Sequence, residues 1–142
     1  MKKILVLNGP NMNLLGKRQP EIYGTLTLSQ LNGSLRQKAE GMGLAVDFFQ
    51  SNSEGELIDR IHSLEGEYQG ALLNAGAYTH TSVALRDALL AVDVPVIEVH
   101  LTDPDSREDF RRRSYLSGAA LGVVAGFGPR SYELALYYFA TA

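Results

Sequence analysis

The sequence contains no cysteine, which excludes disulfides, thiolate nucleophiles, iron–sulfur clusters and cysteine zinc sites. Basic residues are outnumbered by acidic ones, 13 against 16, and the net charge of −3 disfavours a non-specific nucleic-acid binder. No apolar run approaches the roughly 18 residues that a membrane span requires. The short apolar run near the N-terminus is not followed by the cleavage site of a signal peptide. We therefore expect a cytoplasmic protein that binds neither nucleic acid nor membranes.

Several motifs of common cofactor and catalytic sites are also missing. No Gly-x-Gly-x-x-Gly or Walker pattern follows the first apolar run, so a nucleotide phosphate site has little support. The histidines and acids show no metal-binding spacing, and no serine stands in a Gly-x-Ser-x-Gly motif. Lysines are scarce after the apolar runs, which disfavours Schiff-base catalysis. We expect neither a metal nor a cofactor.

The length of 142 residues and the apolar fraction of 45% predict a single domain, residues 1–142, with a core of its own. Short apolar runs alternate with segments in which apolar residues recur every three or four positions. The runs predict strands at 4–7, 44–49, 71–74, 95–100 and 119–125. The periodic segments predict helices at 27–42, 53–64, 83–90, 106–113 and 132–139. Ser53 and Glu56 are spaced as a capping box at the start of the second helix.

Five successive strand–helix units indicate an α/β protein, a doubly wound parallel sheet with helices on both faces. For five strands we expect the flavodoxin-like order 2-1-3-4-5, with Asp47 placing the second strand near a sheet edge. The switch point then lies between the first and third strands. Ligands of such sheets bind there, beyond the carboxyl ends of the strands.

Polar side chains follow the strands that flank this point. Asn8-Gly9-Pro10-Asn11 ends the first strand, Asn74 to His80 follow the third, and His100-Leu101-Thr102 end the fourth. Asparagine and glycine also form ordinary turns, so each end alone has two explanations. His100 shares a strand face with Glu98 and could be a core residue, but its place at the strand end favours chemistry. The three ends together predict a binding site.

Two cationic segments extend this prediction. The segment Gly16 to Gly24 is long for a strand–helix connection, and we interpret it either as a lid or as a permanently docked loop. Within it, Arg18 could stabilise an ionised Tyr23. In the predicted helix 106–113, Arg107 and Arg111 share one face, which suits a carboxylate substrate. A solvated helix face explains Arg112 and Arg113 equally well.

At these residues the sequence resembles the type II 3-dehydroquinate dehydratase family. The matching segments span nearly the whole chain: Asn8 to Asn11, Arg18 with Tyr23-Gly24, Phe49 to Asn52, Gly76 to Ala88, Glu98 to His100, and Arg107 to Arg111. The resemblance implies a flavodoxin-like fold, a homododecamer built from trimers, and dehydration of 3-dehydroquinate to 3-dehydroshikimate in the shikimate pathway. The sequence departs from the family pattern at Ser53, Ala75 and Asp103-Pro104.

The resemblance also implies roles for individual residues. Tyr23 would remove the C2 proton, Arg18 would keep Tyr23 ionised, and His100 would protonate the departing C1 hydroxyl. Asn11 would stabilise the enolate through a bound water. The residues implied to hold substrate are Asn74, His80, Arg111, the backbone of Leu101 and Thr102, and Asp87 from a neighbouring subunit.

Two other hypotheses remain open from the residues alone. A flavodoxin-like binding module for a flavin or another phosphate ligand would share the fold and lack the chemistry. A catalytically silent relative with a structural role would share the fold and the motifs. An assay of turnover separates both from a hydro-lyase.

Overall fold

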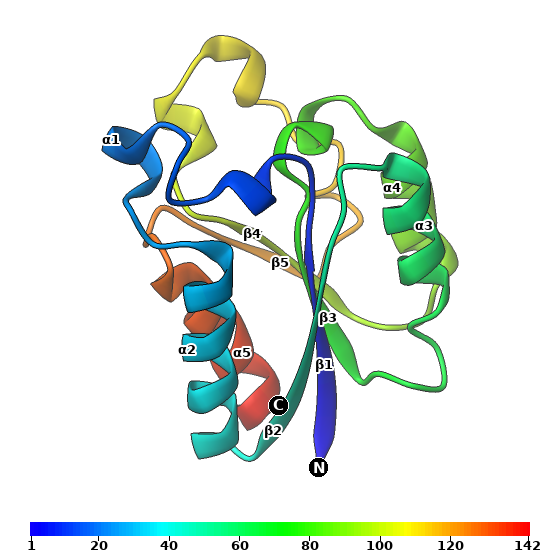
Figure 1. The fold of residues 1–142 in the computed structure, drawn as a ribbon. Coiled ribbons are helices and arrows are strands. Elements are labelled where there is room, and N and C mark those ends of the chain that lie inside the picture. Colours follow the sequence, from blue (N-terminus) through cyan, green and yellow to red (C-terminus); the bar gives the residue numbers. More distant parts are fainter.

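The computed structural model describes residues 1–142 as one five-stranded parallel sheet with helices on both faces (Figure 1). The strands are β1 (Lys2–Asn8), β2 (Leu44–Gln50), β3 (Gly70–Asn74), β4 (Val96–His100) and β5 (Gly122–Ala125). Their order, β2-β1-β3-β4-β5, confirms the predicted topology. β2 is an edge strand, as Asp47 had indicated.

Four α-helices and four 3-10 helices connect the strands, and a fifth α-helix follows the last strand. The α-helices are α1 (Pro20–Tyr23), α2 (Leu28–Gly41), α3 (Glu54–His62), α4 (Val83–Ala91) and α5 (Arg130–Thr141). The 3-10 helices are η1 (Met12–Leu14), η2 (Gly76–His80), η3 (Pro104–Ser106) and η4 (Asp109–Arg111). None of these helices combines the length and the apolar character needed to cross a membrane.

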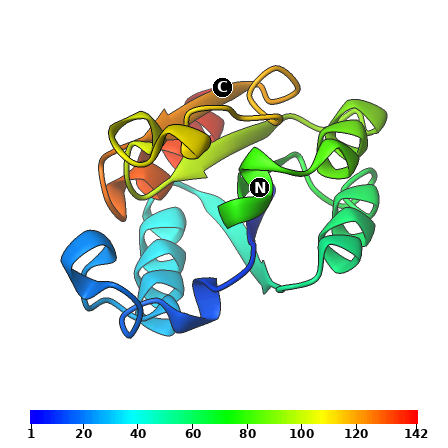
Figure 2. The same cartoon turned by 90° about the horizontal axis from the view of Figure 1, so that it is seen from above.

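Two apolar layers hold the helices to the sheet. Helices α2 and α5 cover one face, and α3 and α4 cover the other (Figures 1 and 2). Successive side chains of β1 alternate between them: Ile4 and Val6 pack with α2 and α5, whereas Leu5 and Leu7 pack with α3 and α4. The central strands are buried on both faces, which explains why their sequences are nearly continuous apolar runs.

The helix starts differ in part from the prediction. The Ser53 hydroxyl accepts a hydrogen bond from the Glu56 amide, as expected for an N-cap. The predicted return bond from Glu56 to the Ser53 amide is wrong. Ser51 intervenes, because its hydroxyl accepts from the Ser53 amide at 2.9 Å and donates to the Glu56 carboxylate. A full capping box occurs instead at α2, between Thr27 and Gln30.

The predicted helix over 106–113 is also wrong. This segment forms only the short turns η3 and η4. Its one large apolar side chain, Phe110, is 66% exposed, so a helix here would have no buried face to stabilise it. The strand predicted from 119 begins only at Gly122, because the Ala119 and Ala120 amides both bond to the Leu116 carbonyl in a turn.

Candidate active site

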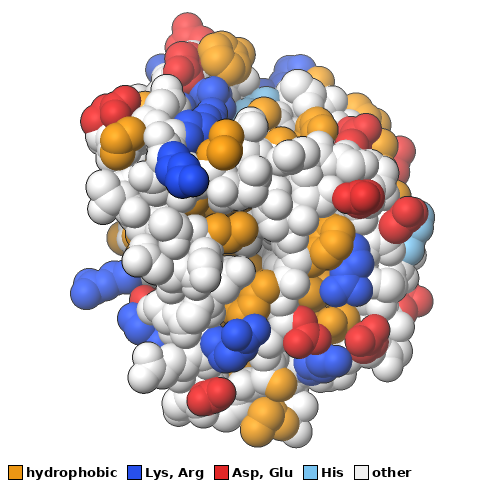
Figure 3. Space-filling view, viewed as in Figure 1, with side chains coloured by type: hydrophobic (Ala, Val, Ile, Leu, Met, Phe, Trp, Pro, Cys, Tyr) orange, Lys and Arg blue, Asp and Glu red, His pale blue; other side chains and the backbone are white.

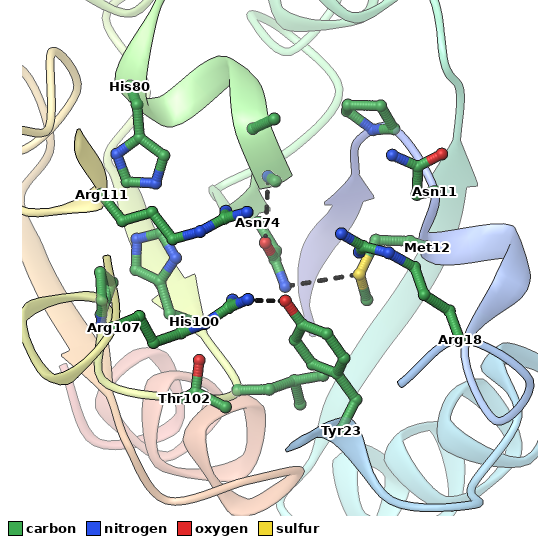
Figure 4. A pocket seen from close by; sticks show the side chains of 15 residues that line it. Asn11, Met12, Arg18, Tyr23, Asn74, His80, His100, Thr102, Arg107 and Arg111 are labelled. Atoms are coloured by element: carbon green, nitrogen blue, oxygen red, sulfur yellow. Dashed lines mark hydrogen bonds between the residues drawn. The ribbon is translucent and has the colours of Figure 1, made fainter. Parts of the chain in front are cut away.

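A pocket opens at the carboxyl ends of β1, β3 and β4, at the predicted switch point (Figure 4). The lining residues are Pro10, Asn11, Met12, Arg18, Tyr23, Asn74, Gly76, Ala77, His80, His100, Leu101, Thr102, Pro104, Arg107 and Arg111. The structure therefore brings together every predicted site residue except Asp87. Asp87 lies exposed on α4 and does not line this pocket, so its role at a neighbouring site stays a prediction.

The strand ends form the floor of the pocket. The Gly9 amide bonds to the Asn74 carbonyl at 2.8 Å and holds the ends of β1 and β3 together. A side chain at position 9 would place its Cβ 2.6 Å from the Ala75 carbonyl oxygen, so only glycine permits this approach. Asn11 follows in a left-handed conformation at φ 69°, and its backbone N–H donates to Oδ1 of Asn52 at 3.0 Å.

Tyr23 stands between two arginines. It ends the short helix α1, within the segment Gly16 to Gly24, and it packs on the α2 side of the core. The guanidinium groups of Arg18 and Arg107 lie 5.3 and 5.2 Å from the centre of its ring. Arg107 also donates a hydrogen bond to the Tyr23 hydroxyl, shown as a dashed line in Figure 4. The arginine bonded to this hydroxyl is thus Arg107 and not Arg18.

His100 is paired with a buried carboxylate. Its Nε2 lies 2.5 Å from Oε2 of Glu98, a side chain that is only 2% exposed. The Ser114 and Ser117 hydroxyls donate to the same carboxylate at 3.0 and 2.9 Å. Burial raises the pKa of Glu98, but the hydrogen bond and charge of His100 and the two hydroxyls outweigh burial, so this pKa lies below its ordinary value. Glu98 is therefore an anion that holds the ring of His100 in place.

Asn74 and His80 are oriented by nearby backbone groups, and Arg111 is oriented by a carboxylate. The Gly76 amide donates to Oδ1 of Asn74 at 3.2 Å, and Nδ1 of His80 lies 2.7 Å from the Arg113 carbonyl. That carbonyl can only accept, so Nδ1 of His80 carries a proton. Arg111 is fixed by Glu108, whose carboxylate lies 2.5 Å from its Nε. Figure 4 shows His80, His100, Arg107 and Arg111 on one side of the pocket and Asn11 and Arg18 on the other.

The pocket is cationic, although the chain is acidic overall. Three arginines and two histidines line it, and no aspartate or glutamate does. Basic side chains and a histidine are visible in Figure 3 at the end of the molecule where the strands terminate. Such a pocket favours an anion, and a carboxylate fits the forked geometry of a guanidinium. No group of three or more histidine, aspartate and glutamate side chains is placed to hold a metal ion.

Sequence reasoning missed part of this arrangement. It noted that Glu98 and His100 share a face, and the contact between them confirms this, but Glu98 was not assigned to the site. The spacing of two residues along a strand was the signal that could have found it. Ser114 and Ser117 carried no signal, because they lie outside the helices and strands. Arg107 was placed in a carboxylate-binding cluster rather than on Tyr23.

The sheet order and the cationic pocket at its switch point define an α/β protein of flavodoxin-like topology with a candidate active site at the carboxyl ends of its strands. The sequence model of the family "Dehydroquinase class II" matches residues 2–140, and the chain belongs to this family.

Named relatives agree with this assignment. The 3-dehydroquinate dehydratase of Parasynechococcus marenigrum is 57% identical over 133 residues, which cover 94% of this chain and 91% of the relative. The 3-dehydroquinate dehydratase of Bacillus licheniformis is 53% identical over 139 residues, which cover 98% and 96%. The crystal structure of the type II dehydroquinase from Propionibacterium acnes superposes with a TM-score of 0.97 at 40% identity, covering 100% of this chain and 98% of that one.

Proposed function

We propose that this chain is a 3-dehydroquinate dehydratase, which converts 3-dehydroquinate to 3-dehydroshikimate and water in the shikimate pathway. The observation that carries the proposal is the pairing of two proton-transfer groups across one cationic pocket. Tyr23 with its arginines faces the pocket from one element, and His100 with Glu98 faces it from another. The reaction needs a base, an acid and a group that stabilises an oxyanion, and the pocket contains a candidate for each.

The base in this proposal is Tyr23. An ordinary tyrosine is protonated at neutral pH, so a base of this type requires neighbouring cations. Arg107, bonded to the hydroxyl, and Arg18, over the ring, would supply that charge. The phenolate takes the proton from C2, and the electron pair moves to the C3 carbonyl oxygen to form an enolate. Asn11 would stabilise this oxygen through a bound water.

The acid is His100. The Glu98 carboxylate accepts a hydrogen bond from Nε2–H of His100, which leaves Nδ1 as the nitrogen that delivers the proton. When the enolate collapses, the C1–O bond breaks and His100 protonates the leaving oxygen, so that water departs and a C1–C2 double bond forms. Before the next turnover, Tyr23 must release the proton that it took from C2, and His100 must regain the proton that it gave to the leaving oxygen. The sum of the steps is the loss of one water from the substrate.

The remaining pocket residues would hold the substrate. We assign Arg111 to the carboxylate, and Asn74, His80 and the Leu101–Thr102 backbone to the hydroxyl groups and the rest of the carboxylate. Asp103 replaces an asparagine common in the family and has an exposed side chain beside η3, outside the pocket lining.

We also propose the cytoplasmic homododecamer of trimers that the resemblance implies, with Asp87 completing a neighbour's site. Large apolar side chains that are about half exposed on β5 and α5 support self-association, because an interface would cover them. They are Val123 at 48%, Leu134 at 47% and Tyr138 at 46%.

The test is a direct assay of the purified protein with 3-dehydroquinate. We expect a colourless protein that raises the enone absorbance of 3-dehydroshikimate. Neither a chelator nor borohydride should reduce the rate, because the proposed steps use no metal and no imine. Absence of the enone signal would overturn the proposal, and inactivation by borohydride in the presence of substrate would replace the enolate route with a lysine adduct.

A further inference from the structure

Three polar side chains form a buried hydrogen-bonded chain beneath the pocket. Tyr132 on α5 is fully buried, and Asn8 and Asn74, which pair in register at the ends of β1 and β3, are 1% and 5% exposed. The Tyr132 hydroxyl oxygen lies 2.6 Å from Oδ1 of Asn8 and 2.9 Å from Nδ2 of Asn74. Of the three residues, only Asn74 lines the pocket. These hydrogen bonds therefore connect the side of the sheet covered by α5 to Asn74, which faces the pocket.

The direction of each hydrogen bond in this chain is fixed by its neighbours. The Gly76 amide can only donate, so the atom of Asn74 that accepts from it is the carbonyl oxygen. The amide nitrogen of Asn74 must then face Tyr132 and donate to the hydroxyl oxygen. The single proton of that hydroxyl is left to donate to Oδ1 of Asn8. Burial raises the pKa of Tyr132, so the hydroxyl keeps this proton.

This direction leaves Asn74 one N–H for the pocket. The first N–H is used by Tyr132, and the nearest protein atom to accept the second is Sδ of Met12, at 3.7 Å (Figure 4). A thioether is a weak acceptor, so a substrate oxygen would readily replace it. The Asn74 carboxamide thus presents a donor to the pocket, and it cannot rotate to present its carbonyl oxygen without breaking the bonds to both Gly76 and Tyr132.

We propose that Tyr132 is a positioning residue, whose hydroxyl holds the Asn74 carboxamide so that one N–H points to a substrate oxygen. The proposal rests on the proposed function. Tyr132 does not touch substrate, and Asn74 contacts an oxygen in the ground state and the transition state alike. Loss of the hydroxyl should therefore weaken substrate binding and leave the chemical step nearly unchanged.

The test compares Tyr132→Phe with Tyr68→Phe. Tyr68 is a matched control, because it is 5% exposed and its hydroxyl donates to Asp47 at 2.7 Å, outside the pocket. Both variants should unfold at lower temperature than the parent, because Tyr132→Phe loses the bonds of its hydroxyl to Asn8 and Asn74 and Tyr68→Phe loses the bond to Asp47. Only Tyr132→Phe should raise KM, by about tenfold, a factor that corresponds to one lost hydrogen bond, with kcat within about twofold of the parent. An unchanged KM for Tyr132→Phe, or an equal rise for Tyr68→Phe, overturns the proposal.

Two further variants locate the effect. In an Asn74→Ala background, Tyr132→Phe should add no further change in KM, because the group that it positions is gone. Full additivity of the two changes would contradict the proposal.

Asn8→Ala leaves Tyr132 in the core and removes the acceptor of its proton, so it should also raise KM, but by a smaller factor than Tyr132→Phe. If Tyr132→Phe does not fold, an unchanged KM in Asn8→Ala overturns the proposal. Absence of turnover in the parent protein refutes the proposed function instead.

Discussion

Tyr23 and the cations around it account for the first step of the proposed reaction. Tyr23→Phe keeps the ring that packs against Arg18 and Arg107 and removes only the ionisable oxygen. We expect turnover to fall by about 10²–10⁴-fold, the usual contribution of one general base, while substrate binding is largely retained. Enone formation measures the first quantity, and calorimetric titration with a substrate-like inhibitor measures the second.

Tyr137→Phe is the control for this change, because Tyr137 is 59% exposed on α5 and lies outside the pocket. It should behave as the parent. Turnover by Tyr23→Phe at a rate comparable with the parent would remove Tyr23 from the mechanism.

Glu98 connects catalysis to acid stability. Its pKa is lower in the folded chain than its ordinary value of 4.5, so the unfolded chain takes up the proton first as the pH falls. The stabilisation is present above about pH 4.5 and is lost as the pH drops through the lower, folded value. We expect Glu98→Gln to show a weaker loss of stability below this pH, and to have a lower kcat because an amide replaces the carboxylate that holds the ring of His100. Thermal unfolding measured from about pH 3, where carboxylates titrate, to about pH 7, where they are ionised, tests the first effect.

Glu40→Gln serves as the control for acid stability, since Glu40 is exposed near the end of α2 and makes no hydrogen bond or salt bridge through its side chain. If the unfolding temperature falls equally with pH in the parent and in Glu98→Gln, the pairing of Glu98 with His100 does not contribute to acid stability.

At the scale of elements, the segment Gly16 to Gly24 is the part whose motion matters most. Gly16 adopts φ +91°, and a Cβ there would lie 2.8 Å from the Thr25 carbonyl oxygen, so the start of the segment has a backbone that other residues would strain. We expect the segment to act as a lid that carries Arg18 and Tyr23 over the substrate. Hydrogen exchange and trypsin cleavage after Arg18 should be fast in the free protein and slow with a substrate-like inhibitor.

Cleavage after Arg18 should also abolish activity, because it breaks the chain between Arg18 and Tyr23. The segment then no longer holds these two residues together. Equal protection with and without inhibitor would indicate a permanently docked loop. Tyr23 could then still be the base, but lid closure would have no part in the mechanism.

The sequence predicted the features that a repeated pattern determines. It did not predict those that depend on contacts between residues far apart in the chain. The strand order followed from alternating apolar runs, and the pocket followed from the polar residues at three strand ends, which the topology must bring together. The segment 106–113 has helical spacing of Arg107 and Arg111 but no apolar face, so local pattern misled. The bond from Arg107 to Tyr23 joins the end of α1 to the connection between η3 and η4, far apart in the chain, and no local pattern encodes it.

At the scale of the whole molecule, the proposed assembly makes each site depend on two subunits. Tyr23→Phe and Asp87→Ala should each be nearly inactive, the first in the pocket and the second in the neighbour's pocket. Refolding the two variants together should restore activity, because an Asp87→Ala subunit retains Tyr23 and can receive Asp87 from a Tyr23→Phe neighbour. In a random one-to-one mixture, about a quarter of the sites would be complete.

Light scattering should show that the active species is an oligomer. An active monomer, or mixed oligomers that form without any gain in activity, would contradict the role given to Asp87.

The cationic pocket of an acidic chain has one practical consequence. Three guanidinium groups line a cavity that no acid lines, so an anion that enters it offsets the repulsion between their charges. Phosphate, sulfate and citrate are anions of this kind, so buffers made from them will occupy the pocket and raise the melting temperature while competing with substrate. Kinetic constants and ligand screens for this protein should therefore be measured in a buffer without multivalent anions.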